Sequence, residues 1–271
     1  YLPPIAKGEK LAAFGLTEAN AGSDAGGVET TAKKEEDYYV LNGTKQWITN
    51  GGEAEIYTII AATNKRRGSR GLSAFIVEKG MDGFDFGKKE KKMGIRCSAT
   101  RELVFQNCKV PKENLLAKEG YGFIVALRTL DNARPGVAAQ ALGIAQGAMD
   151  AAMDFARQRI QFGQPVTGFQ AVQHMFADMA TQIEATRALT YAVARTIDSG
   201  TQKDIAKESA MCKLIASDTA MKVTTDALQI MGGSGYMREY PVEKMMRDAK
   251  ITQIYEGTNQ IQRNIIALDL I

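Results

Sequence analysis

The sequence has one histidine and three cysteines among its 271 residues. With His174 alone, a Ser-His-Asp triad and a histidine-rich metal site are both disfavoured, and we expect no metal site. Cys97, Cys108 and Cys212 are odd in number and widely spaced, which argues against a disulfide framework and favours a reducing compartment. The chemistry of this protein must therefore come from carboxylates, a cofactor, or both.

Strong charge and long apolar runs are also lacking. The formal net charge is +3, and basic residues are interspersed with acidic ones, so nucleic acid is not an expected partner. No apolar run approaches the roughly 20 residues that a membrane-spanning helix needs. The chain opens on Tyr1-Leu2-Pro3-Pro4, which we interpret as a start inside a longer protein, although a processed terminus would look the same.

The residue pattern changes near residue 115. Residues 1–115 contain short apolar runs separated by Gly and Asn, which predicts a small β-barrel or sandwich. Within this half, Asn42-Gly43 predicts a hairpin turn between two strands. Residues 116–271 place apolar residues at helical spacing and predict a four-helix bundle. The predicted fold class is α+β, with a β-domain over 1–115 and a helical domain over 116–271.

The segments behind this prediction are short in the first half and long in the second. Strands are expected at 11–17, 38–41, 45–49, 56–63, 72–77 and 102–105. Helices are expected at 136–159, 169–199, 201–231 and 258–271. Gly200 and Gly232-Gly233 stand where the second and third helices should end.

Two segments of the first half are unusual for ordinary structure. The loop 16–27 is rich in Gly and hydroxyl groups, and could present backbone N–H groups to a phosphate or carbonyl. The segment 46–52 contains the only Trp, Trp47, which could stack on a planar ring. A polar surface loop and a packed Trp before a turn are the simpler explanations. The basic clusters near 65–70 and 88–92 are either solvated loop charge or an attraction for a nucleotide phosphate or an acidic surface.

A third unusual segment surrounds Glu256. This carboxylate stands in a break between helical patterns, beside Gly257 and after the apolar Ile254 and Tyr255. Partial burial would raise its pKa toward the range of a useful general base. Thr258 could cap the helix that follows. From the residues alone, Glu256 is either such a base or an ordinary turn residue.

Four segments together resemble one family, the acyl-CoA dehydrogenases. They are Thr17-Glu18-x-x-Ala21-Gly22-Ser23-Asp24, Trp47-Ile48-Thr49-Asn50-Gly51, Gln229-Ile230-Met231-Gly232-Gly233-x-Gly235-Tyr236 and Arg247-Asp248-Ala249-Lys250-Ile251-x-x-Ile254-Tyr255-Glu256-Gly257-Thr258. Their order and spacing match over the whole chain. The family implies FAD and a β-domain between two helical domains, so the N-terminal helical domain would be absent here. Ala19, where the family usually has Pro, and Pro135, where glycines are common nearby, are departures.

The resemblance implies a role for each matching residue, beginning with Glu256 as the catalytic base. The implied FAD contacts are Phe14, Leu16, Thr17, Ser23, Trp47, Ile48, Thr49, Arg159, Gln161, Phe162, Gln170, Gln229, Gly232, Gly233, Thr258 and Gln260. Among these, Trp47 and Thr49 would lie against the isoalloxazine ring, and Arg159 and Gln229 would reach the flavin of a neighbouring subunit. The implied substrate contacts are Ser23, Asp131, Arg134, Tyr236 and Gly257.

The implied reaction removes two hydrogens from adjacent carbons of an acyl thioester. Glu256 would take the α-proton, flavin N5 would accept the β-hydride, and the Glu256 N–H with a ribityl hydroxyl would polarise the carbonyl. Gly235-Tyr236 resembles short-chain members acting on butyryl-CoA-like substrates. An acyl-CoA oxidase, an enoyl-CoA reductase and a non-catalytic flavin- or CoA-binding relative are the alternatives.

The resemblance also implies partners and a location. We expect an acyl-CoA substrate, an electron-transfer flavoprotein and a homo-oligomer built as a dimer of dimers. The expected location is the cytoplasm of a bacterium, or the mitochondrial matrix if the source is eukaryotic. Acyl chain length, the physiological direction, and FAD binding without the N-terminal domain are not set by the sequence.

Overall fold

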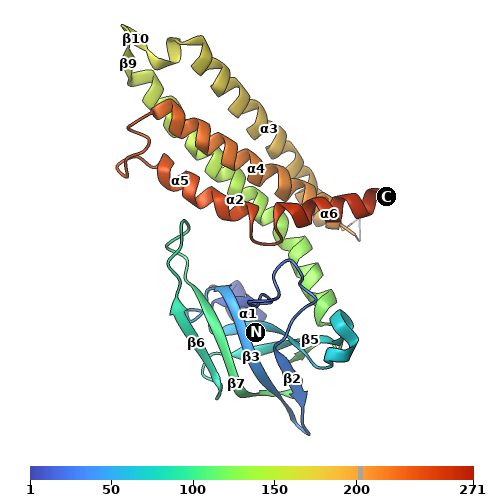
Figure 1. Cartoon of the computed structure of the whole chain (residues 1–271). Helices are drawn as coiled ribbons and strands as arrows, with labels where there is room; N and C mark the ends of the chain where they lie inside the picture. Colours follow the sequence, from blue (N-terminus) through green and yellow to red (C-terminus); the bar gives the residue numbers. More distant parts are fainter. Residues whose placement is uncertain (201–203) are drawn as a thin grey trace. The chain divides into compact units, whose positions relative to one another are not determined.

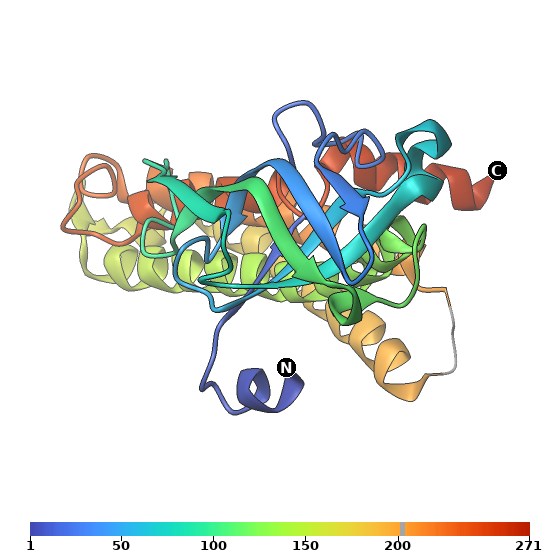
Figure 2. The same cartoon turned by 90° about the horizontal axis from the view of Figure 1, so that it is seen from below.

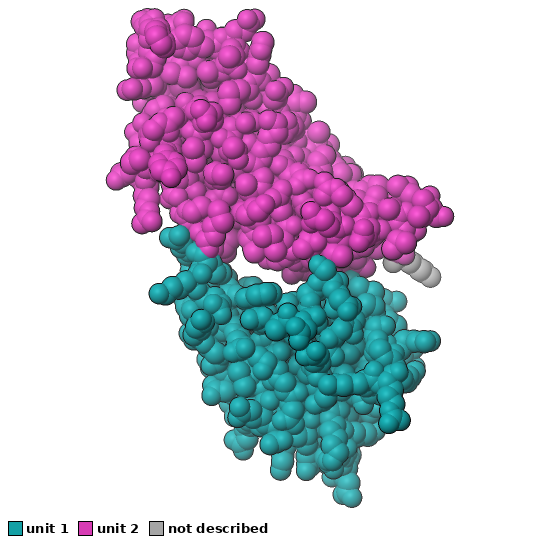
Figure 3. Space-filling view, viewed as in Figure 1, with its two compact units in different colours: residues 1–92, 96–129 teal, residues 93–95, 130–271 magenta. Residues whose placement is uncertain are grey.

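The computed structural model describes residues 1–200 and 204–271, which form two compact units (Figure 3). The first unit contains residues 1–92 and 96–129, and the second contains 93–95 and 130–271. The first is built on a β-sheet and the second on helices, so the predicted α+β class is confirmed. No helix within the described ranges is both long and apolar enough to cross a membrane.

The first unit is an eight-stranded mixed sheet (Figure 1). Its strands are β1 (Ala12–Gly15), β2 (Thr31–Lys34), β3 (Tyr38–Thr49), β4 (Ile56–Ala62), β5 (Leu72–Glu78), β6 (Phe84–Lys89), β7 (Thr100–Pro111) and β8 (Leu115–Leu116). The order is β6-β7-β3-β2-β4-β5-β8, and β1 pairs in parallel with β4. Short helices complete the unit: α1 (Leu2–Ala6), η1 (Lys65–Gly71) and η2 (Lys112–Asn114). Strands β2, β6 and β8 were not predicted.

The predicted hairpin turn at Asn42-Gly43 is wrong, because β3 runs through it as one strand with a register shift against β7. The Asn42 side chain bonds across the pair to Asn107, accepting from its backbone N–H at 2.8 Å. Gly43 has φ +143°, and a Cβ there would lie 2.7 Å from the Thr30 Cα. The glycine therefore permits a close approach of two backbones within a bulge, rather than a chain reversal.

The second unit has three long helices, α2 (Gly122–Gln158, shared with the first unit), α3 (Gln170–Ser199) and α4 (Ala206–Met231). Its shorter elements are β9 (Ile160–Gln161), β10 (Gln164–Pro165), η3 (Val166–Gly168), α5 (Val242–Ala249), η4 (Lys250–Gln253) and α6 (Asn259–Leu270). The helix predicted at 136–159 begins earlier, because α2 continues through the buried Pro135. Residues 201–203 of the third predicted helix lie outside the described residues. Since α5 adds a second short helix, the four-helix count stays a prediction.

Small residues bring the long helices close together. The buried positions of α2 are mostly alanines at helical spacing: Ala138, Ala141, Ala145, Ala148, Ala152 and Ala156. The larger side chains Phe176, Met179 and Ile183 of α3 belong to the same buried cluster. Figures 1 and 2 both show α2, α3 and α4 alongside one another. Gly200, at φ +61°, ends α3 in the left-handed conformation that the sequence predicted for a glycine stop.

Candidate active site

Glu256 lies in a tight turn between η4 and α6, and its backbone is strained. Its φ is +53°, a conformation that side chains with a Cβ adopt at a cost of about 1–3 kcal/mol. The next residue, Gly257, has φ +88°, and a Cβ there would lie 2.7 Å from the Gln262 Nε2. Two successive positive φ values persist only where the surrounding structure holds them.

Side chains from three helices hold this turn by its two carbonyl oxygens. Arg134 Nε of α2 donates to the Glu256 carbonyl at 3.3 Å, and Lys213 Nζ of α4 donates to the Gly257 carbonyl at 2.8 Å. Gln262 Nε2 of α6 donates to both, at 3.1 and 2.8 Å. All three side chains are buried. The turn is therefore fixed from several sides by groups far apart in the sequence.

A buried polar cluster between α4 and α6 supports the same turn. Lys213 Nζ also donates to Asn259 Oδ1 at 2.9 Å. The Asn259 Nδ2 donates to Ser217 Oγ at 2.9 Å and to Asp218 Oδ1 at 2.7 Å. Thr258 caps α6, since its Oγ1 accepts from the Ile261 N–H at 3.3 Å, as the sequence predicted. These bonds set where α6 begins, and with it the position of Glu256.

The Glu256 carboxylate itself is half-buried and receives no hydrogen bond from the described residues. Burial raises its pKa above the ordinary value for Glu, and the positive charges of Arg134 and Lys213 partly oppose that shift. Burial also lowers the pKa of Lys213 to about 8. An ionisable carboxylate with a raised pKa and no fixed partner is typical of a general base.

Asp131 and Arg134 form an ion pair on one face of α2, one turn apart. Arg134 Nη1 lies 2.6 Å from Asp131 Oδ1, and the Arg134 side chain is only 2% exposed. Burial raises the pKa of Asp131, although the guanidinium opposes that shift. The structure thus places Arg134 against the turn that carries Glu256.

In the first unit, the Gly-rich loop 16–27 is anchored by a buried ion pair. Lys45 Nζ of β3 lies 2.6 Å from Glu18 Oε1 and donates to the Leu16 carbonyl at 2.9 Å. The Glu18 carboxylate also accepts the backbone N–H groups of Glu29 and Thr30. Burial would raise the pKa of Glu18, but Lys45 and these donors hold it below its ordinary value.

Trp47 lies in a bulge of β3 and presents its ring to solvent. Its φ is +58°, the register against β7 shifts between Lys45 and Ile48, and the residue is 58% exposed. Thr49 and Ser23 are exposed too, whereas Phe14 and Thr17 are partly buried. Leu16 and Ile48 are buried, so their backbones rather than their side chains are the groups available to a ligand. An exposed, strained Trp flanked by hydroxyl groups suits a planar ring system.

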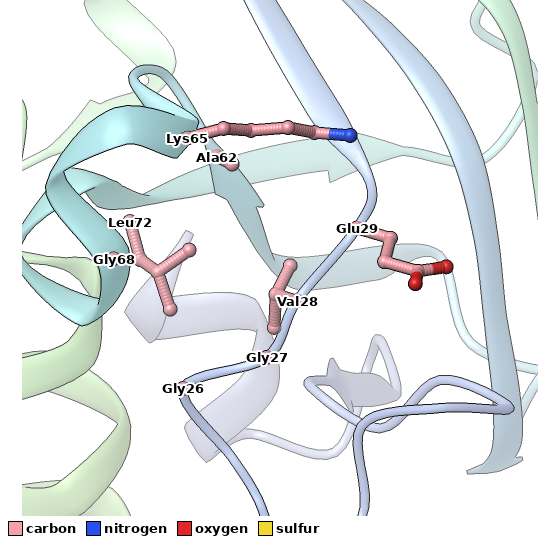
Figure 4. A pocket seen from close by; sticks show the side chains of 8 residues that line it. All are labelled: Gly26, Gly27, Val28, Glu29, Ala62, Lys65, Gly68 and Leu72. Carbon is pink, nitrogen blue, oxygen red and sulfur yellow. The ribbon is translucent and has the colours of Figure 1, made fainter.

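A hollow of about 290 Å³ adjoins the Gly-rich loop in the first unit. Figure 4 shows Gly26, Gly27 and Val28 along one side of it, and Gly68 and Leu72 along the other. Lys65 also lines the hollow, so the basic cluster near 65–70 borders it. Because the Glu29 carboxylate lines it as well, the hollow has one basic and one acidic side chain at its edge.

The remaining predicted contacts of the second unit lie in three exposed places. Arg159, Gln161 and Phe162 lie at the β9–β10 hairpin with Gln170 shortly after it, and Phe162 is 95% exposed at the tip with φ +50°. Gln229, Gly232, Gly233 and Tyr236 lie at and after the end of α4, where a Cβ on Gly233 would meet nothing within 4 Å. Gln260 is exposed in the first turn of α6.

Sequence reasoning missed Glu18, Lys45 and Lys213 as parts of the site. Lys45 continues the inward alternation of Tyr39 and Leu41 along β3, and this could have marked it as buried. Lys213 falls on the buried face of α4, four residues from both Ser209 and Ser217. A lysine at an inward position needs a buried partner, which is the signal that was available.

Known proteins match the chain over both units. Residues 13–108 match the family model for the acyl-CoA dehydrogenase middle domain, and residues 120–271 match that for the acyl-CoA dehydrogenase C-terminal domain. The short-chain-specific acyl-CoA dehydrogenase of Megasphaera elsdenii is 55% identical over 97% of this chain and 68% of its own length. The acryloyl-CoA reductase (NADH) of Anaerotignum propionicum is 54% identical over 100% of this chain and 68% of its own length.

Solved structures agree with these matches. The butyryl-CoA dehydrogenase of Megasphaera elsdenii has a TM-score of 0.98 and 54% identity, covering 100% of this chain and 70% of that one. A chain from a study of the electron transferring flavoprotein of Acidaminococcus fermentans has a TM-score of 0.98 and 56% identity, covering 100% and 71%. The fold and the comparisons define a flavoprotein oxidoreductase: this chain belongs to the acyl-CoA dehydrogenase family.

Proposed function

We propose that this protein dehydrogenates a short-chain acyl-CoA thioester between its α and β carbons, with Glu256 as the base and FAD as the hydride acceptor. The observation that carries the proposal is Glu256 itself, a half-buried carboxylate with a raised pKa on a turn that three helices hold. A base needs a fixed position and a carboxylate that no internal donor occupies, and Glu256 meets both requirements among the described residues.

Each group of the turn has a task in this reaction. The Glu256 carboxylate takes the α-proton, and the backbone N–H of Glu256 donates to the thioester carbonyl as negative charge develops on it. A donor placed in advance is worth a few kcal/mol in comparable sites. The carbonyl groups of Glu256 and Gly257 are both held by hydrogen bonds. The backbone N–H and the carboxylate of Glu256 therefore keep a fixed position relative to each other. Bound FAD would supply the two-electron redox chemistry that no side chain provides.

Several exposed groups support FAD as the cofactor. Trp47 presents a ring to solvent from a strained bulge, with the Thr49 hydroxyl two residues away. The Gly-rich loop, which contains Ser23, is anchored by a buried ion pair, so its backbone is fixed before a ligand binds. We propose that Arg159, Gln161, Phe162, Gln170, Gln229, Gly232 and Gly233 contact the flavin of a second subunit in a dimer of dimers. The other flavin contacts proposed are Phe14, Leu16, Thr17, Ile48, Thr258 and Gln260.

The substrate class rests on the relatives. A relative and a solved structure, both from Megasphaera elsdenii, are named as a short-chain-specific and a butyryl-CoA dehydrogenase. These names favour a butyryl-CoA-like substrate, with proposed contacts at Ser23, Asp131, Arg134, Tyr236 and Gly257. The 54% identical acryloyl-CoA reductase favours a second candidate, in which the same base works in the reducing direction. An electron-transfer flavoprotein is the proposed redox partner, supported by the 56% identical chain from a study of such a protein.

Replacing Glu256 by Gln tests the proposal. The variant should bind FAD and turn yellow like the parent, because the amide preserves the shape of the turn. On anaerobic mixing with butyryl-CoA, its flavin should stay oxidised while the parent is bleached within the same time. Glu239→Gln, an exposed neutralisation in the same unit, is the control and should bleach normally. Parent-like bleaching of Glu256→Gln would contradict the assignment.

A further inference from the structure

Lys213 is a buried cation to which the proposed reaction assigns no transfer of a proton or an electron. It lies on α4 with a fully buried side chain, and its ammonium group donates to the Gly257 carbonyl at 2.8 Å and to Asn259 Oδ1 at 2.9 Å. Removing a lysine charge from water is costly, and a lysine is retained in such a place only where its partners compensate. Here both partners belong to the segment that directly follows Glu256.

We propose that Lys213 is a positioning residue that holds the turn of the base by two hydrogen bonds and keeps a positive charge near the Glu256 carboxylate. This inference rests on the proposed role of Glu256. The bond to Gly257 holds the second peptide after the base, and the bond to Asn259 holds the first residue of α6. Lys213 therefore links α4 to both sides of the Thr258 cap.

Lys213 acts differently from the other two side chains that hold the turn. The charge of Arg134 is shared with Asp131, and Gln262 is neutral. The ammonium of Lys213 lies within hydrogen-bond distance only of neutral oxygens among the described residues. Its charge is thus not used in a close ion pair, and it opposes the burial that raises the pKa of Glu256.

The other charged groups around the turn must be considered for any pH effect. The titratable groups on the elements packed here are Asp131 and Arg134 on α2, Cys212 and Asp218 on α4, Tyr255 before the base, and Arg263 on α6. Asp218 already accepts from Asn259 and Gln253, and burial raises the pKa of Tyr255 to about 12. Compared with these groups, Lys213 can be neutralised without breaking an ion pair, so its replacement changes only the charge near the Glu256 carboxylate and the two hydrogen bonds to the turn.

The test is the pH dependence of flavin reduction in the FAD-loaded enzyme. A base must be ionised to act, so the rate of anaerobic bleaching by butyryl-CoA rises with pH through the pKa of Glu256. Without the Lys213 charge the carboxylate ionises less readily, so Lys213→Met should move the midpoint upward by about one pH unit. The maximal rate should also fall at least about tenfold, the cost of a misplaced base, with little change in KM.

Two further variants distinguish charge from packing. Lys213→Gln is a milder neutral replacement and should raise the midpoint as Met does, whereas Lys213→Arg should keep the parent midpoint. Lys222→Met, the same substitution at an exposed site on α4, is the matched control and should change neither quantity. Difference infrared spectra of the Glu256 carboxyl band, titrated without substrate, give the midpoint of the free enzyme, which the neutral Lys213 variants should move in the same direction.

The outcomes separate this inference from the proposed function. A parent-like midpoint in folded Lys213→Gln, with Glu256→Gln inactive, would overturn the role of Lys213 and leave the base assignment intact. An active Glu256→Gln would overturn the proposed function itself. If Lys213→Met does not fold, Lys213→Gln and Lys213→Arg decide the question, because a purely structural lysine would lower Tm in both without moving the midpoint.

Discussion

Each unit of this protein sets a buried lysine near a carboxylate that is withdrawn from solvent, fully at Glu18 and by half at Glu256, but the two arrangements differ in one respect. In the first unit Lys45 bonds to the Glu18 carboxylate, which also accepts two backbone N–H groups. In the second unit Lys213 bonds to a backbone carbonyl beside Glu256, and the carboxylate receives no hydrogen bond from the described residues. The pKa of Glu18 is accordingly held low, while that of Glu256 is raised.

The difference separates a structural carboxylate from a reactive one. The Glu18 carboxylate has an ion-pair partner and two backbone donors, so it anchors the Gly-rich loop and is held in its ionised form. The backbone of Glu256 is fixed, while its carboxylate accepts no hydrogen bond from the described residues and so stays available to bind a proton. The position of the lysine relative to the carboxylate decides which outcome results.

Breaking the pair in the first unit should have the largest effect on stability. Glu18→Gln or Lys45→Met leaves one buried group uncompensated, which costs about 3–5 kcal/mol in such pairs. The double variant should lose less than the sum of the two, because neither charge is then stranded. Urea unfolding followed by the Trp47 fluorescence reports on this unit. Additive losses would show that the pair contributes nothing as a pair.

Adding a side chain to the turn of the second unit should have an intermediate effect. Gly257→Ala forces a Cβ to within 2.7 Å of Gln262 Nε2 at φ +88°, so stability should fall by about 1–3 kcal/mol. The rate should fall as well, since the clash displaces Glu256. Gly80→Ala is the control, with φ +94° but nothing within 4 Å of the new Cβ. A loss of rate equal to the control's would refute the packing argument.

Mild acid should show the smallest effect and should distinguish the two carboxylates. The lowered pKa of Glu18 contributes stability that is present above its ordinary pKa of 4.5 and is lost as pH falls through the folded value. The raised pKa of Glu256 has the opposite sign, so protonating it on acidification favours the folded state. Hydrogen exchange measured from pH 6 down to pH 3, which covers the range below 4.5 where the Glu18 contribution is lost, should therefore show the Gly-rich loop losing protection before the Glu256 turn does. Glu18→Gln should remove that difference in the loop.

The sequence allowed the fold class, the ends of α3 and α4 and the Thr258 cap to be predicted, because these depend on local pattern and on Gly or Thr chemistry. It misled at Asn42-Gly43, where a long-range approach to Thr30 overrides a local turn signal. The helix through Pro135 was missed for the same kind of reason, since tertiary packing on α2 outweighs the local penalty.

The candidate site likewise has one part that could be predicted from the sequence and one part that could not. Glu256 could be singled out because Gly257 and a helix break are visible in the sequence. Its supports could not, since Arg134 and Lys213 reach it across 122 and 44 residues of chain, the second through Gly257. Such contacts depend on how α2, α4 and α6 pack, which no local spacing encodes.

Because Glu256 has a positive φ, the residue that activity requires at this position differs from the residue that stability favours. Glycine adopts this backbone without strain, and asparagine does so more readily than most residues. A library randomised at codon 256 and screened only for heat resistance should therefore enrich glycine and asparagine, and every such clone should lack turnover. This chain has the more strained residue there, and the same experiment run with an activity screen should return glutamate.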